Sequence, residues 1–248
     1  MKINYENIIT DVCKVCAYKT AQYITVRDQK KIEHVKKLEK SLSRLKDKIN
    51  KDLKSDDIQT RLTALIVGLI DKTYERVGND ESAENGHYGI TGLKVKHLTF
   101  GDGKVTLQYV GKSGVKHKKQ INNKPIVDAL KNSIKNKDKD DYIFYKDGTK
   151  LNGVHVNKYL EPFKITAKDI RCFYANKIMR QILKRIRNEK GKLPTDKKEK
   201  NKLKDKEFKE ALEETAKIIG HESATLKKHY LLPNFADDLY DGLYKIKE

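Results

Sequence analysis

Residues 95–121, VKHLTFGDGKVTLQYVGKSGVKHKKQI, contain three short apolar runs separated by two glycine-rich turns. The first turn, Gly101-Asp102-Gly103, places an Asp-Gly pair between apolar runs, which favours a tight β-hairpin. The second turn, Gly111-Lys112-Ser113-Gly114, leads into the third run. This stretch therefore predicts a three-stranded antiparallel sheet with Lys112 at a hairpin tip.

Helical patterns dominate the chain before this sheet. Over residues 29–53, apolar residues recur at steps of three and four with lysines between them, which predicts an amphipathic helix with a narrow apolar stripe. The stripe consists of Ile32, Val35, Leu38, Leu42, Leu45 and Ile49. A second helix is predicted to begin after Asp56 or Asp57 and to end just before Arg76. Upstream, Tyr23-Ile24-Thr25-Val26 has the composition of a strand.

Helices are also predicted throughout the second half of the chain, over residues 125–134, 152–163, 166–186, 208–219 and 225–230. Apolar residues are few between 188 and 206, so this stretch is predicted to be a mobile connector or the solvated start of the next helix. The predicted fold class is therefore α+β and mostly α. Residues 56–248 are expected to form one domain, and residues 1–55 to be part of it or appended to it.

The charge balance of the chain indicates a polyanionic partner. Its 248 residues include 54 lysines and arginines against 35 aspartates and glutamates, a formal net charge of +19. Such an excess suits nucleic acid. Three cysteines are too few for a disulfide framework. The sequence shows neither a signal peptide nor an apolar run approaching the ~18 residues of a membrane span.

Five polar residues stand in short, recognisable frames. Arg76 lies in Glu75-Arg76-Val77-Gly78-Asn79, Lys112 in the hairpin turn, Arg171 in Lys168-Asp169-Ile170-Arg171, His221 after Gly220, and Tyr230 in Lys228-His229-Tyr230. A tyrosine phenol is a possible nucleophile for a phosphodiester, and the cationic groups stabilise the negative charge that grows on the phosphate oxygens. The set therefore predicts cleavage of a phosphodiester without a metal ion, with Tyr230 as the nucleophile.

The order and spacing of these frames resemble the catalytic domain of type IB DNA topoisomerases, especially the compact viral and bacterial enzymes. His221 follows Arg171 by 50 residues, and Tyr230 follows nine residues later. Two further stretches look like segments of that family: NGHYGITGL at 85–93 and the lysine hairpin at 110–117. The resemblance runs from about residue 23 to residue 233.

This resemblance implies the DNA breaking-rejoining fold, a helical catalytic domain with a small three-stranded antiparallel sheet. It also implies an enzyme that nicks one strand of duplex DNA through a 3′-phosphotyrosyl intermediate, relaxes supercoils by strand rotation and reseals without ATP, metal or another cofactor. The expected partner is double-stranded DNA, bound by a monomer, with no membrane and no small-molecule substrate. The expected location is intracellular: the cytoplasm, a virus factory or virion, or the nucleus, depending on the host.

The resemblance also implies individual roles. Arg76 and Arg171 would pair with phosphate oxygens, His221 would donate a hydrogen bond to a non-bridging oxygen, and Lys112 would be the general acid for the departing 5′ oxygen. Two assisting residues are expected, and these are Lys168 as a second proton donor and Asn176 as an orienting group.

Four observations leave alternatives open. The second possibility is a tyrosine recombinase, because these enzymes share the fold and chemistry. They usually carry a histidine where this chain has Lys168, which favours the topoisomerase interpretation. The third possibility is a non-catalytic basic DNA-binding module. Cys172 replaces a usual threonine, and the separate β-rich N-terminal clamp domain of the family is not expected here. Cys13-x-x-Cys16 with His34 resembles part of a zinc site but lacks a fourth ligand, so buried thiols on a short helix are the favoured interpretation.

Overall fold

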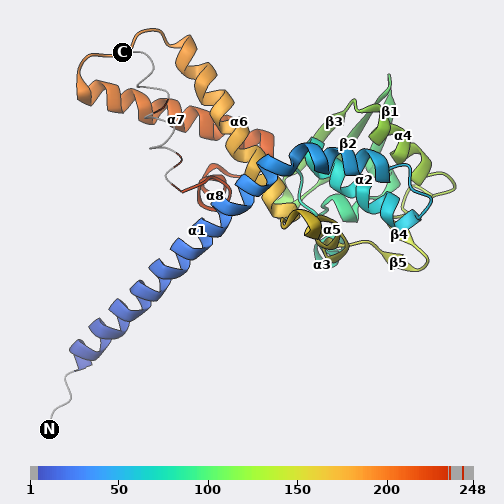
Figure 1. Ribbon diagram of the computed structural model, residues 1–248, viewed down its shortest axis with the longest axis horizontal. Helices are drawn as coiled ribbons and strands as arrows, with labels where there is room; N and C mark the ends of the chain where they lie inside the picture. Colours follow the sequence, from blue (N-terminus) through green and yellow to red (C-terminus); the bar gives the residue numbers. More distant parts are fainter. Residues whose placement is uncertain (1–4, 234, 236–241, 243–248) are drawn as a thin grey trace.

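The computed structural model describes residues 5–233, 235 and 242, with the backbone alone for residues 5–25 and residue 113. Within these residues the chain is mainly helical and carries one three-stranded antiparallel sheet (Figure 1). The predicted α+β, mostly helical class is therefore confirmed. None of the helices in this part of the chain combines the length and apolar character that a bilayer crossing requires.

The first helix is much longer than its apolar stripe. Helix α1 spans Tyr5–Asp52, so the strand-like composition of residues 23–26 was misleading. A run of four such residues cannot form a strand without a partner to pair with, and the helix formers on both sides extend the helix through it. The stripe behaves as predicted, because Val35, Leu38, Leu45 and Ile49 are buried.

Helix α2, Ile58–Thr73, forms the centre of the core. Asp57 caps it by accepting a 2.8 Å hydrogen bond from the Thr60 N–H, and residues 62–71 are buried without interruption. The helix packs against α1, α4 (Lys124–Ser133), α5 (Gly153–Leu160) and α6 (Ala167–Glu189). It ends at Tyr74, which adopts a left-handed conformation with φ of 61°. Arg76 therefore lies two residues beyond the left-handed residue that ends α2.

The predicted sheet is present in the predicted order. Strands β1 (Leu98–Gly101), β2 (Lys104–Val110) and β3 (Lys116–Ile121) pair antiparallel, with β2 in the middle. Asp102 and Gly103 both have positive φ, as a tight hairpin turn requires. Lys112–Gly114 forms a 3₁₀ turn between β2 and β3. A second, short hairpin was not predicted. It consists of two strands of two residues each, β4 (Tyr145–Lys146) and β5 (Thr149–Lys150).

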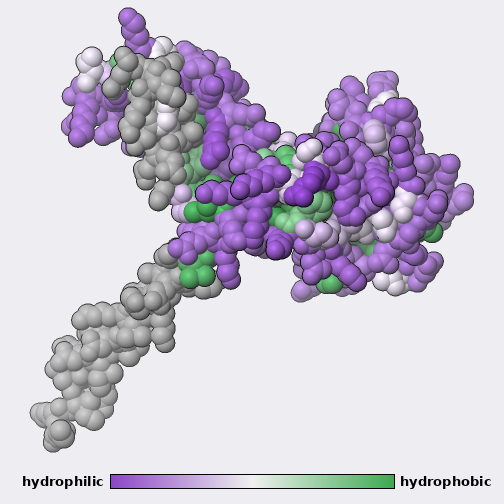
Figure 2. Space-filling view, viewed as in Figure 1, coloured by the Kyte–Doolittle hydropathy of each residue, from purple (hydrophilic) through white to green (hydrophobic). Residues whose placement is uncertain are grey.

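The remaining helices form a projection on the other side of α1. Helix α6 begins beside α5, crosses α1 and continues into this projection, where α7 (Lys197–Ile219) lies beside it, whereas the sheet, α2, α4 and α5 gather opposite (Figure 1). Residues 197–206 are thus the solvated start of a helix, one of the two alternatives. Helix α8, Ser223–His229, packs on α7. Smaller elements are α3 (Asp80–Glu84) and 3₁₀ turns at Ile90–Gly92, Val95–His97 and Glu161–Phe163. Hydrophilic residues cover most of the face in Figure 2.

Candidate active site

The backbone around Arg76 is held by a second segment. The Arg76 carbonyl accepts a 2.9 Å hydrogen bond from the Ile90 N–H. Gly78 and Gly89 approach so closely that a Cβ on Gly89 would lie 2.5 Å from the Gly78 Cα. Gly78 also has a φ of +96°, which disfavours any other residue. The stretch 85–93 therefore serves to fix the position of Arg76, whose side chain is half-buried.

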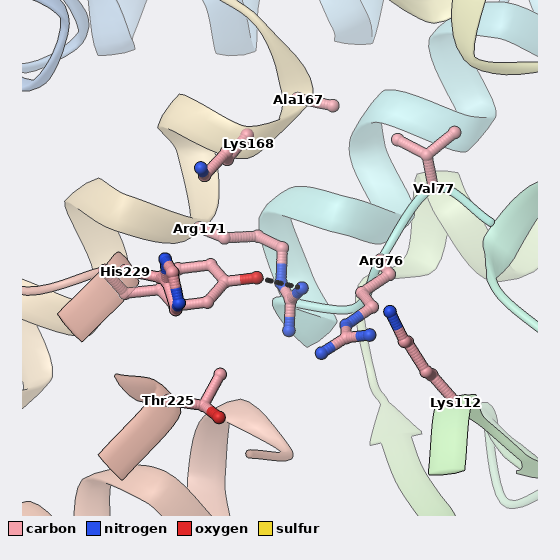
Figure 3. A pocket seen from close by; sticks show the side chains of 9 residues that line it. Arg76, Val77, Lys112, Ala167, Lys168, Arg171, Thr225 and His229 are labelled. Atoms are coloured by element: carbon pink, nitrogen blue, oxygen red, sulfur yellow. Dashed lines mark hydrogen bonds between the residues drawn. The ribbon is translucent and has the colours of Figure 1, made fainter. Parts of the chain in front are cut away.

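Arg171 connects the ends of three helices. It lies in the first turns of α6 and is only 4% exposed. Its Nε donates to the Tyr74 carbonyl at 2.6 Å, and its Nη2 donates to the Ile219 carbonyl at 3.1 Å. Its Nη1 donates to the Tyr230 hydroxyl at 3.1 Å, the contact drawn as a dashed line in Figure 3. The guanidinium group is thus held rigidly between the ends of α2, α7 and α8.

His221 lies against both arginines. Its Nδ1 is 3.0 Å from Nη2 of Arg76, and its Nε2 is 3.1 Å from Nη2 of Arg171. Burial, followed by the charges of Arg171 and Arg76, lowers the pKa of His221 to about 3, so its imidazole is neutral near pH 7. A neutral imidazole has one acceptor nitrogen, whereas both arginines only donate. This cluster therefore has more donors than acceptors, which is the arrangement that binds an anion.

Tyr230 follows directly after α8 and faces this cluster. The residue is 8% exposed, its ring centroid lies 4.5 Å from that of His221, and the guanidinium carbon of Arg171 lies 5.1 Å from its centre. Asn176 on α6 holds the adjoining backbone, because its Nδ2 donates to the Tyr230 carbonyl at 2.9 Å and its Oδ1 accepts from the Leu232 N–H at 2.9 Å. The phenol oxygen is therefore fixed from both the side-chain and the backbone directions.

A cavity of about 500 Å³ opens between these groups (Figure 3). It is lined by Arg76, Val77, Lys112, Ala167, Lys168, Arg171, Thr225, His229 and Tyr230. The Lys112 side chain is exposed and points from the hairpin turn towards Arg76. Of the seven residues predicted from sequence, five line this cavity, while His221 and Asn176 contact residues that do. The structure brings all of them together from segments up to 154 residues apart in the chain.

Sequence reasoning missed several residues of this site. Thr225 and His229 line the cavity from α8, which the sequence identified only as the carrier of Tyr230. Cys172, which the sequence had already singled out after Arg171, is buried, and burial raises the pKa of its thiol to about 11, so the thiol is protonated at neutral pH. Neither a half-buried threonine nor a histidine beside lysines differs in sequence from an ordinary surface residue, so no local signal could have found Thr225 or His229.

No group of three or more histidine, cysteine, aspartate or glutamate side chains is placed to bind a metal in the part of the chain whose side chains are described. The side chains of Cys13 and Cys16 lie outside that part. His34, the third member of the possible zinc half-site, instead places its Nδ1 3.0 Å from an Asp169 carboxylate oxygen. That oxygen also accepts from the Thr166 N–H and caps α6.

Comparison with known proteins shows the family of this chain. Residues 20–241 match the model of the family "Eukaryotic DNA topoisomerase I, catalytic core". The DNA topoisomerase 1B of Acanthamoeba polyphaga mimivirus is 28% identical over 197 residues, which are 74% of this chain and 56% of that protein. Human DNA topoisomerase 1 is 26% identical over 171 residues, which are 64% of this chain and 22% of that protein. The chain thus spans about half of the viral relative and about a fifth of the human one.

A solved structure shares the fold. It is that of the XerH site-specific recombinase bound to a palindromic difH substrate in a post-cleavage complex, with a TM-score of 0.50 and 16% identity. The match covers 86% of this chain and 51% of that chain. At this identity the similarity shows the fold alone, which is that of the DNA breaking-rejoining enzymes.

Proposed function

Because the chain belongs to the family of the eukaryotic DNA topoisomerase I catalytic core, we propose that it is a type IB DNA topoisomerase acting through Tyr230. In this proposal the Tyr230 oxygen attacks a phosphorus atom of duplex DNA. A bond from phosphorus to the tyrosine oxygen forms at the 3′ side, the bond to the 5′ oxygen breaks, and the phenolic proton passes to water. The nicked strand then rotates about the intact strand and is resealed by the reverse reaction.

The cationic side chains supply the stabilisation that this reaction needs. Arg76 and Arg171 pair with the non-bridging oxygens, on which charge grows in the transition state, because guanidinium forks match that geometry. Neutral His221 has one N–H to donate to the same oxygens. Lys112 gives a proton to the departing 5′ oxygen, and general acid catalysis of this kind is worth roughly 10²–10⁴-fold in rate.

The reaction is proposed to need neither ATP nor a metal ion. The phosphotyrosyl ester retains the energy of the broken phosphodiester, so the 5′ hydroxyl can reverse the step without an energy source. Two guanidinium groups, of Arg76 and Arg171, and two ammonium groups, of Lys112 and Lys168, line the same cavity as Tyr230, and they carry the positive charge that metal ions carry in other phosphoryl-transfer sites. A monomer suffices for this activity, because one tyrosine cuts one strand.

The observation that carries the proposal is the contact of Arg171 with the Tyr230 hydroxyl at the wall of a cavity that Arg76 and Lys112 also line. The test is incubation with negatively supercoiled plasmid in EDTA without ATP. We expect a ladder of relaxed topoisomers from the wild-type protein and none from Tyr230→Phe. Unchanged plasmid with the wild-type protein, at concentrations that bind it fully, would contradict the proposal.

A tyrosine recombinase is the second candidate, supported by the shared fold of the XerH structure. Such an enzyme would exchange strands between two specific sites. Relaxation of plasmids that lack any defined site favours the topoisomerase, whereas products that appear only when two copies of one sequence are present favour the recombinase. Lys168, where recombinases usually carry histidine, lines the cavity and supports the first reading.

A further inference from the structure

One buried imidazole touches three separate segments that lead into the proposed site. His117 lies on β3 and is 8% exposed. Its ring contacts Glu75, Gly111 and Gly220, which immediately precede Arg76, Lys112 and His221. We propose that His117 is a positioning residue that sets the relative placement of those three side chains. The inference rests on the function proposed above, because that function gives the three residues their roles.

The contact with Glu75 is an ion pair or a hydrogen bond in the core. The Nδ1 of His117 lies 2.8 Å from Oε1 of Glu75, whose side chain is only 2% exposed. Burial alone would raise the pKa of Glu75, but the hydrogen bond and charge of His117, with Lys119 and Arg171, lower it below its usual value. Glu75 is therefore a carboxylate, and an unpaired carboxylate at this depth would be costly.

The contacts with the two glycines are close approaches of backbone to ring. A Cβ on Gly111 would lie 2.5 Å from Nε2 of His117, and a Cβ on Gly220 would lie 2.7 Å from its Cε1. At Gly220 the φ of +75° favours glycine whatever lies nearby, whereas Gly111 has a φ of −97°, which any residue can adopt. At Gly111, therefore, the requirement for glycine comes from the imidazole. The ring is wedged between the Lys112 turn and the end of α7.

Neighbouring side chains hold the ring in this place. The ring of Tyr109 stacks on that of His117 with a centroid distance of 5.1 Å and an angle of 9° between planes. Two residues along β3, Lys119 lies 3.5 Å from the same Glu75 oxygen and donates a 2.5 Å hydrogen bond to the Ile218 carbonyl. Strand β3 thus joins the end of α2 to the end of α7. His117 is absent from the lining of the cavity, so it acts through the residues that it supports.

The consequence is kinetic. Three groups that must surround one phosphate come from the end of α2, the β2–β3 turn and the end of α7, and the ring contacts all three segments. A displacement of about 1 Å at a catalytic group can cost about 10²-fold in rate. Loss of the imidazole contacts should therefore slow strand cleavage much more than it weakens DNA binding, since exposed lysines elsewhere remain free to bind the phosphate backbone of the DNA.

The test compares His117→Phe with His97→Phe. His97 is a matched control, because it is also 8% exposed and its ring lies 6.3 Å from that of the same Tyr109. Its own contacts are with the Tyr88 ring and the Lys94 N–H, whereas Glu75, Gly111 and Gly220 contact His117. The measurements are the single-turnover cleavage rate of a duplex at saturating protein, and duplex affinity by fluorescence anisotropy. For His117→Phe we expect a loss of about 10²-fold in rate with affinity within about threefold. His97→Phe should keep its rate within about threefold.

Equal rates in the two variants would overturn the proposal. A third variant, His117→Asn, keeps a donor for Glu75 but removes the ring edge that faces Gly111, and its rate should lie between those of wild type and His117→Phe. If His117→Phe fails to fold, His117→Asn takes its place in the test. A wild-type cleavage rate in His117→Asn would then refute the positioning role of His117.

A readout without catalysis separates this inference from the proposed function. Hydrogen–deuterium exchange at residues 111–114 and 220–222 should be faster in His117→Phe than in His97→Phe. If the wild-type protein does not cleave DNA, the proposed function fails, and the exchange result alone decides whether His117 orders these segments. Unchanged exchange at both segments would contradict the positioning role.

Discussion

Nη1 of Arg171 donates a 3.1 Å hydrogen bond to the Tyr230 hydroxyl, and the guanidinium carbon lies 5.1 Å from the centre of the same ring. The other nitrogens of Arg171 are bound to the carbonyls of Tyr74 and Ile219. The arginine therefore cannot follow the phenol if the phenol moves. This relationship places the proposed nucleophile beside a fixed positive charge before any substrate arrives, which lowers the reorganisation that the reaction requires.

Arg171→Lys tests the need for the guanidinium fork. Lysine keeps the charge but cannot bond Tyr74, Ile219 and Tyr230 at the same time. We expect the single-turnover cleavage rate to fall by about 10²–10³-fold, with duplex affinity changed much less. Arg180→Lys, an exposed arginine on the same helix, is the control. A rate within threefold of wild type in Arg171→Lys would mean that the fork has no role in the chemistry.

Lys112→Ala tests the general acid. Removing the ammonium group should slow cleavage of an ordinary duplex by about 10²–10⁴-fold. A duplex with a 5′-bridging phosphorothiolate has a leaving group that needs no proton, so it should largely restore the rate. Lys118→Ala, an exposed lysine on the adjoining strand, should behave as wild type on both duplexes. Absence of rescue would remove the proton-donor role from Lys112.

The lowered pKa of His221 predicts how stability depends on pH. The folded protein holds that pKa at about 3, through burial and through Arg171 and Arg76, whereas a histidine in an unfolded chain titrates near 6.5. Between these values the unfolded state binds more protons, so the free energy of unfolding falls as the pH drops from about 6.5 towards 3. Above pH 7 the group is neutral in both states and makes no such contribution.

Urea unfolding of wild type and His221→Gln at pH 7.5 and pH 5 measures this effect. The variant lacks the titrating group, so the wild type should lose more stability than the variant between the two pH values. Identical losses would show that the imidazole is not kept neutral by its surroundings.

The positive charge predicts strong salt dependence of DNA binding. If ~6–10 phosphates are neutralised, affinity should fall by roughly 10³–10⁵-fold between about 50 and 200 mM salt. Lys168→Ala removes one exposed cation from the cavity wall and should reduce the slope of log affinity against log salt by about one. Anisotropy titrations at four salt concentrations give both slopes. A slope near zero for the wild type would contradict binding through the phosphate backbone.

Much of the fold follows from local sequence signals. The hairpin at Asp102-Gly103 was predicted because positive φ at a two-residue turn leaves few residue choices. The apolar stripe predicted the buried face of α1 but not its start, since helix formers extend a helix beyond its packed part. The strand-like composition of residues 23–26 was misleading, because these residues lie within α1 and β propensity depends on a pairing partner that local sequence does not reveal.

The candidate site was predictable only as a set of residue types in order. Arg76 and His221 lie 145 residues apart in the chain, and nothing local to either residue indicates their 3.0 Å contact. The 2.8 Å contact between Glu75 and His117 was missed for the same reason. A buried acid beside a buried histidine becomes visible only when β3 packs between the ends of α2 and α7.

The most direct measurement is identification of the residue that becomes linked to DNA. The protein is incubated with a duplex in which the short strand released by cleavage, which carries the 5′ hydroxyl, diffuses away, so that the covalent complex accumulates. The complex is then digested with trypsin and analysed by mass spectrometry. We predict a nucleotide adduct on the phenol oxygen of Tyr230 and no adduct in Tyr230→Phe. An adduct on any other residue, or a covalent complex that persists in Tyr230→Phe, would contradict this prediction.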